Sequence, residues 1–215
     1  MALSLGQSLA ALVMLGACVG WAAQHAPWRR LHDSEQSHVF LGSIVAVALL
    51  WSISSAIGAL PRLHLLGATL MVLMFGPRLA LIGMTAAVAL SAAIGPESLA
   101  AAPLRALVGG VLPIAVSHGI LRFCEEKLPP NFFVYVFGAA FFSGAAAMWA
   151  ACIASAILLN TYTPAALPPD TPITAVLLML GFAEATLTGM LATLMAVYRP
   201  RWIWTFSDER YLRRS

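Results

Sequence analysis

The stretch RLHLLGATLMVLMFGPRLAL, residues 62–81, contains two apolar runs that meet at Gly76-Pro77. At 1.5 Å per residue the first run, 64–76, would form a helix only about 20 Å long, whereas the hydrocarbon core of a bilayer is about 30 Å thick. Proline interrupts a helix because it has no N–H and its ring clashes with the preceding turn. We therefore predict a short helix that ends at Gly76-Pro77, where a break separates it from the helix that follows. Broken helices in membranes are tolerated where their freed backbone is buried or lines a cavity, and they mark binding sites.

The composition indicates an all-α integral membrane protein. Of 215 residues, 60% are hydrophobic and only 10% are charged, and the mean hydropathy is +0.86. A soluble protein of this length needs more charge to cover its surface. No stretch is long enough for a separate soluble domain, so we expect 1–215 to form a single transmembrane domain in the lipid bilayer. The net charge of +3 lies mostly in the C-terminal tail, which is a topology signal and does not indicate nucleic-acid binding.

Apolar runs of spanning length predict the remaining helices, since about 20 residues cross the hydrocarbon core. They lie at about 4–23, 39–60, 104–121, 132–159 and 173–197. With the broken pair around Gly76-Pro77 the total is about seven transmembrane helices, which places the two termini on opposite sides of the membrane.

The basic residues orient these helices. If the C-terminal tail 199–215 is cytoplasmic and the N-terminus is outside, ten of the 12 Lys and Arg residues lie inside, and only Arg62 and Arg105 lie outside. This bias matches the positive-inside rule for a multi-pass protein of the cytoplasmic (inner) membrane. The same topology places His64 on the outer side, at the start of the short helix.

Glu184 lies near the middle of the last predicted span. A charge at that depth costs at least about 2.5 kcal/mol, so an intramembrane carboxylate is a candidate functional residue. It would either lock two helices together or take a ligand or gating role, and Arg105 and His118 are candidate partners on the fifth predicted span. Residues spaced four apart in 139–155 and 181–189 are small, which suits close helix packing within the chain or against a partner subunit.

The sequence offers no signature of an enzyme. The motifs GxxxxGK, HExxH and GxSxG are absent, and Lys127 is the only lysine. Without a P-loop the chain cannot cradle ATP in that way, so energy for any transport must come from another subunit.

Two segments carry a resemblance to a known family. The stretch from His64 to Gly76-Pro77, and AEATLTGMLATLMAVYRPRW at 183–202, resemble the cobalt- and nickel-uptake membrane components of energy-coupling-factor transporters, the CbiM/NikM type. The resemblance implies a seven-helix permease subunit that binds a transition-metal cation, cobalt or nickel, at its outer side. It also implies a transmembrane coupling subunit and ATPase subunits as partners, with no permanently bound cofactor. His64 takes the place of the metal-ligating histidine, and an imidazole nitrogen suits either metal.

The chain departs from this family at its start. Members typically begin Met-His, and the amine, the second backbone nitrogen and the histidine ring all bind metal, whereas this chain begins Met1-Ala2. The second ligand would then be the amine of Met1, or of Ala2 if Met1 is removed. Ser91 stands where the family often has glutamine, and the family's square-planar site of four nitrogens cannot be built in the same way. Two alternatives therefore stay open: the same fold with another small ligand or as an accessory protein of metal homeostasis, or a structural or assembly membrane protein.

Overall fold

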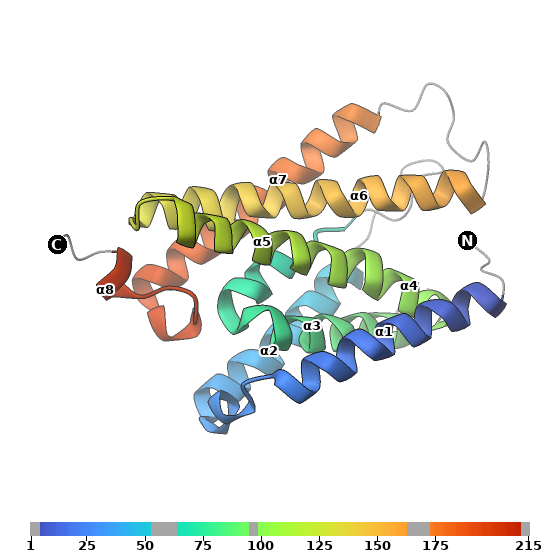
Figure 1. Ribbon diagram of the computed structural model, residues 1–215, viewed down its shortest axis with the longest axis horizontal. Helices are drawn as coiled ribbons and strands as arrows, with labels where there is room; N and C mark the ends of the chain where they lie inside the picture. Colours follow the sequence, from blue (N-terminus) through green and yellow to red (C-terminus); the bar gives the residue numbers. More distant parts are fainter. Residues whose placement is uncertain (1–4, 53–63, 95–98, 163–172, 212–215) are drawn as a thin grey trace.

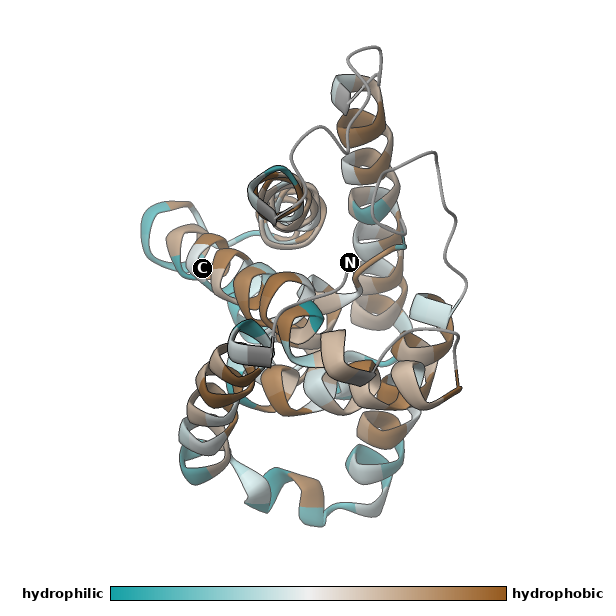
Figure 2. Cartoon of the chain, turned by 90° about the vertical axis from the view of Figure 1, so that its right-hand side faces the viewer, coloured by the Kyte–Doolittle hydropathy of each residue, from teal (hydrophilic) through white to brown (hydrophobic). Residues whose placement is uncertain are grey.

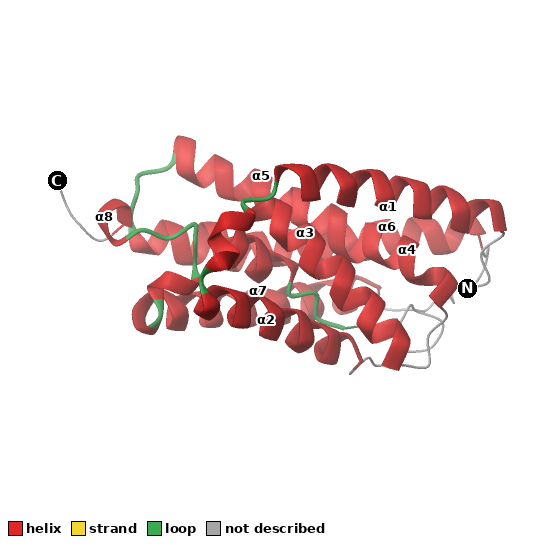
Figure 3. Cartoon of the chain, turned by 90° about the horizontal axis from the view of Figure 1, so that it is seen from below, coloured by secondary structure: helices red, strands yellow, loops and turns green. Residues whose placement is uncertain are grey.

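The computed structural model describes residues 5–52, 64–94, 99–162 and 173–211, and these form helices joined by short connections (Figure 1). The described residues contain no strand, as Figure 3 shows. The first elements are α1 (Leu5–His25), η1 (Trp28–His32), α2 (Ser34–Ser52), α3 (Ala68–Ile94), η2 (Leu99–Ala101), α4 (Ala102–Ala106) and η3 (Leu107–Val111). They are followed by α5 (Leu112–Lys127), η4 (Val134–Phe142), α6 (Ser143–Tyr162), α7 (Ile173–Tyr198), η5 (Pro200–Trp202) and α8 (Asp208–Tyr211).

The helices have the length and composition of a multi-pass membrane protein. Within the described residues, five helical stretches are long and apolar enough to span a bilayer: 6–25, 68–94, 102–127, 134–161 and 174–198. Helix α4, the π-helical turn η3 and helix α5 run on as one of these stretches, and η4 and α6 form another. Counting α2, and α3 as two pieces, gives the expected seven helices. Most outward-facing side chains along them are apolar, and Figure 2 shows the hydrophobic colours along the helices.

Some predicted helix boundaries were wrong. Helix α2 begins at Ser34, five residues before the predicted span, because Asp33 precedes it with a side chain that accepts the N–H of Glu35 at 3.0 Å. The predicted part of this span from 53 to 60 lies outside the described residues. Helix α5 continues to Lys127, six residues beyond the end of the predicted span at 104–121.

One end of the bundle, which we call the basic end, collects residues 25–34, 76–78, 125–133 and 199–211 (Figure 1). Arg78 joins it to α1 by donating to the His25 carbonyl at 3.0 Å. Gln36 donates to the Arg201 carbonyl at 2.9 Å, and the indole N–H of Trp204 donates to Gln36 at 3.0 Å. The C-terminal segment is therefore fastened to the start of α2.

The predicted break at Gly76-Pro77 is confirmed. Gly76 has φ 76° and ψ 167°, which divides α3 into a short helix, 68–75, and a longer helix, 77–94. The two pieces fold against each other, because a Cβ placed on Gly83 would lie 2.5 Å from the Met71 methyl group. In a straight helix these two residues would be about 18 Å apart. The short helix also begins later than predicted, at Ala68, since residues 64–67 are not helical.

The small residues of 139–155 and 181–189 pack within the chain. Ala139, Ser143, Ala147 and Ala185 are buried, and a Cβ on Gly144 would lie 3.4 Å from the Ala185 Cα. Small side chains allow helix backbones to approach closely in a membrane, where apolar burial alone does not drive association. The stripes therefore join α6 to α7 within one molecule.

Candidate functional site

Glu184 meets the start of the short helix. Its side chain, 1% exposed, lies near the middle of α7. The backbone N–H of Leu66 donates to Oε2 and that of Gly67 to Oε1, both at 2.8 Å. The first N–H groups of a helix have no partner inside the helix, and its positive end favours an anion. The carboxylate of Glu184 therefore fastens α7 to the N-terminal end of 68–75, in the geometry expected of a residue that locks two helices.

This arrangement differs from the predicted partners of Glu184. Arg105 and His118 were the candidates, but backbone N–H groups occupy both carboxylate oxygens. These donors lie 118 and 117 residues away in sequence, and side-chain types alone do not point to them. Helix α5 contacts the short helix through Ser117, whose hydroxyl lies 2.8 Å from that of Thr69.

His64 lies two residues before Leu66 and packs on Trp51. The centroids of the two rings are 4.2 Å apart, and the ring planes are inclined by 35°. The imidazole is half-buried, and its Nδ1 lies 3.2 Å from the Leu65 carbonyl oxygen. A carbonyl oxygen only accepts, so Nδ1 carries the proton in this contact, and in the neutral imidazole Nε2 then keeps its lone pair. In metal sites, the ring nitrogen of a histidine that does not bind the metal commonly donates to a carbonyl, and this hydrogen bond fixes the orientation of the ring. The contact of Nδ1 with Leu65 has the same arrangement.

Trp51 connects the groups of this site. Its indole N–H donates to the Leu66 carbonyl at 3.1 Å, and its side chain is 2% exposed. The guanidinium carbon of Arg105 lies 5.4 Å from the centroid of the same ring, within the range of a cation–π contact. Trp51 was not singled out from the sequence. A tryptophan 13 residues before a histidine carries no local signal of contact, because only the tertiary fold brings two such residues together.

A glycine makes room for this tryptophan. A Cβ on Gly109 would lie 2.6 Å from the Cη2 atom of Trp51, a distance that real side chains do not adopt. We expect Gly109→Ala to lower the free energy of unfolding by about 1–3 kcal/mol, as overpacking does in a core, because Trp51 is held by Leu66 and His64 and cannot withdraw freely. Thermal unfolding in detergent micelles, followed by circular dichroism, measures this loss.

Gly119→Ala is the matched control. Gly119 lies in the same helical stretch, and a Cβ there would meet nothing within 4 Å. It should leave the melting temperature unchanged or raise it slightly, because alanine favours a helix over glycine by up to about 1 kcal/mol. Equal melting temperatures for the two variants would show that Trp51 is not fixed in this position.

The described residues do not contain a complete protein-derived metal site. No group of three or more His, Cys, Asp and Glu side chains within them could hold a metal ion together. Of the two predicted metal ligands, His64 lies in the site described above, whereas Met1 lies outside the described residues, as does Ala2. His64 and Arg105 both contact the ring of Trp51. Glu184 accepts from the backbone of Leu66 and Gly67, which lie two and three residues after His64 in the chain.

Comparison with known proteins identifies the family of the chain. The family model described as the cobalt uptake substrate-specific transmembrane region, CbiM, matches residues 1–202. This chain belongs to the CbiM family. It is therefore a membrane component of metal transport and not an enzyme.

Two solved structures share the fold of this CbiM-family chain. One is the crystal structure of a transition metal transporter, with a TM-score of 0.71, 22% sequence identity, and coverage of 92% of this chain and 93% of that one. The other is a truncated transition metal transporter, with a TM-score of 0.71, 21% identity, and coverage of 89% and 95%. A search of curated proteins gave no match.

Proposed function

We propose that this CbiM-family chain is the substrate-binding membrane subunit of an energy-coupling-factor transporter, and that it takes up cobalt or nickel with His64 as a protein ligand. The observation that carries the proposal is the orientation of His64. Trp51 packs on its ring, and the Leu65 carbonyl accepts from Nδ1, which leaves the lone pair of Nε2 for a cation. Neutral imidazole nitrogen is a good ligand for both metals.

The second ligand in this proposal is the N-terminal amine, from Met1 or, after its removal, from Ala2. An amine and one imidazole supply two nitrogens, so water or a small molecule would complete the coordination of the metal. Because a histidine at position 2 is missing, we expect weaker or less selective binding than a site with four protein nitrogens would give.

Transport requires partners in this proposal. The chain has no P-loop, so a transmembrane coupling subunit and ATPase subunits would supply the energy. The basic end of the bundle would face the cytoplasm, and residues 64–67 would open toward the outside of the cytoplasmic membrane. The excess of Lys and Arg at the basic end supports this orientation.

Arg105 favours a second candidate function, the transport or sensing of another small ligand. Its guanidinium lies over the Trp51 ring that also contacts His64. A fixed positive charge near the imidazole disfavours a bare divalent cation and favours a ligand that carries negative charge. Binding measurements with metal salts separate the two candidates, because only the first requires that Co²⁺ or Ni²⁺ bind alone.

The experiment is a titration of the detergent-purified chain with Co²⁺ and with Ni²⁺, by isothermal calorimetry and by metal content after desalting. We expect stoichiometric binding to the wild type and a loss of affinity of at least about tenfold for His64→Ala, since one of few protein ligands is removed. His32→Ala is the control, because His32 is exposed at the basic end.

Three results would count against the proposal. If neither metal binds to the wild type, the chain does not take up these cations unaided. If His64→Ala binds as well as the wild type, the ligand is another group. If His32→Ala loses as much affinity as His64→Ala, the binding is nonspecific.

A further inference from the structure

The short helix 68–75 is held at both ends by a single later part of the chain. Glu184 accepts the N–H groups of Leu66 and Gly67 at its start. At its other end the Met74 carbonyl accepts the N–H of Trp204 at 3.1 Å, and the Leu73 carbonyl accepts the N–H of Thr205 at 3.3 Å. The piece 184–205 therefore spans the whole short helix.

The sequence explains why the second contact is needed. In a continuous helix the Leu73 carbonyl would accept the N–H of residue 77, but that residue is proline and has none. Pro77, which breaks the helix, therefore also removes the ordinary donor of the Leu73 carbonyl. Thr205 replaces this donor twice, through its N–H and through its hydroxyl, which donates to the Leu73 oxygen at 2.9 Å.

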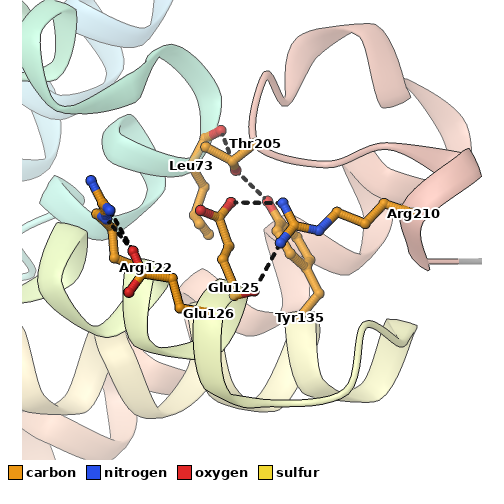
Figure 4. A network of polar contacts seen from close by, with 7 residues as sticks. All are labelled: Leu73, Arg122, Glu125, Glu126, Tyr135, Thr205 and Arg210. Carbon is orange, nitrogen blue, oxygen red and sulfur yellow. Dashed lines mark hydrogen bonds and ion pairs between the residues drawn. The ribbon is translucent and has the colours of Figure 1, made fainter.

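Thr205 is itself fixed by a buried tyrosine (Figure 4). The Tyr135 hydroxyl lies 2.7 Å from Thr205 Oγ1, and the Tyr135 side chain is 0% exposed. Since the Thr205 hydroxyl donates to Leu73, the hydrogen of the Tyr135 contact must come from Tyr135. The chain of donors runs from Tyr135 to Thr205 to Leu73. It links η4, the C-terminal segment and the short helix.

We propose that Thr205, supported by Tyr135, is a positioning residue for His64. The short helix is a rigid rod of eight residues, about 12 Å long. Its first residue, Ala68, lies four residues after His64, and its far end is held by Thr205. A shift of that far end moves the rod, and with it the peptide units 65–67 that orient the imidazole. The affinity of the site for a cation therefore depends on a hydroxyl at the opposite end of the rod.

This inference rests on the proposed function, and the test is a double-mutant cycle with Co²⁺ as the probe. Thr205→Val removes the hydroxyl at nearly constant shape and keeps the backbone N–H. We expect it to weaken Co²⁺ binding about 3- to 10-fold, the effect of one hydrogen bond, and Thr205→Ser to bind within about twofold of the wild type. In a His64→Ala background Thr205→Val should weaken the residual binding no further.

A second variant covers the case in which Thr205→Val folds poorly. Tyr135→Phe leaves Thr205 in place and removes only the hydroxyl that donates to it, so we expect a smaller loss of Co²⁺ affinity in the same direction. The inference is overturned if Thr205→Val and Tyr135→Phe bind Co²⁺ like the wild type. It is also overturned if Thr205→Val weakens binding equally with and without His64. If the wild type binds no Co²⁺, or if His64→Ala alone has no effect, the proposed function fails and this inference falls with it.

Discussion

Glu184→Ala is expected to lower the free energy of unfolding by about 3–6 kcal/mol, because it removes the acceptor of two buried hydrogen bonds to a charged group, each of which contributes about 1.5–3 kcal/mol. The N–H groups of Leu66 and Gly67 would then be left without a partner inside the bundle. Water cannot replace the carboxylate at low cost in a site that is 1% exposed. We expect little folded protein in detergent, measured as the monodisperse fraction in size-exclusion chromatography and by thermal unfolding.

Glu184→Gln separates this structural role from a gating role. Each carboxylate oxygen accepts one N–H, but an amide has only one oxygen, so its NH₂ group would face the second donor. We expect a loss of stability of about half that of Glu184→Ala, and a loss of Co²⁺ binding only in proportion to the loss of folded protein.

Thr186→Ala, two residues along the same helix at an exposed position, is the control and should behave like the wild type. A Glu184→Gln variant as stable as the wild type but inactive in uptake would instead support gating. A Glu184→Ala variant with unchanged stability would show that the short helix does not depend on this carboxylate.

The sequence contained enough information for the outline of the fold. Apolar runs predicted the long helices because a spanning helix must satisfy its own backbone and present apolar side chains to lipid. Gly76-Pro77 predicted the break because its cause is local: proline removes a donor, and glycine permits the turn. The choice of Glu184 as a candidate residue followed from the cost of a charge at that depth.

The contacts of the site were not predictable in the same way. The partners of Glu184 are backbone groups more than 100 residues away, and their position depends on the relative depth of α3 and α7. The packing of Trp51 on His64 depends on how α2 and residues 64–67 are placed relative to each other, which no local pattern of residues indicates. The sequence indicates only part of the contact made by Thr205. Pro77 leaves the Leu73 carbonyl without its helical donor, but no local pattern of residues indicates which residue supplies another.

Gly76→Ala is expected to lower the free energy of unfolding by about 1–3 kcal/mol, the strain of a non-glycine residue in this region of backbone space. Residues other than glycine almost never adopt φ 76° and ψ 167°. The strain comes from the backbone conformation and not from a clash, because a Cβ at this position would meet nothing within 4 Å. The break is also what turns 68–75 back against 77–94 and sets the far end of the short helix at Thr205. Relief of the strain would therefore straighten α3 and withdraw residues 65–67 from Glu184.

Gly42→Ala gives a control of opposite sign. Gly42 lies within α2, is exposed, and has open space around its Cα, so alanine should raise stability by about 0.5–1 kcal/mol through its helix propensity. The two variants add the same methyl group to the same chain, and both are measured by thermal unfolding in the same detergent. If both stabilise the protein, Gly76 does not hold the positive φ, and the short helix must be a continuous part of α3. If Gly76→Ala alone destabilises it and also weakens Co²⁺ binding, the reversal of the chain at Gly76 is what places His64 in a position to bind the cation.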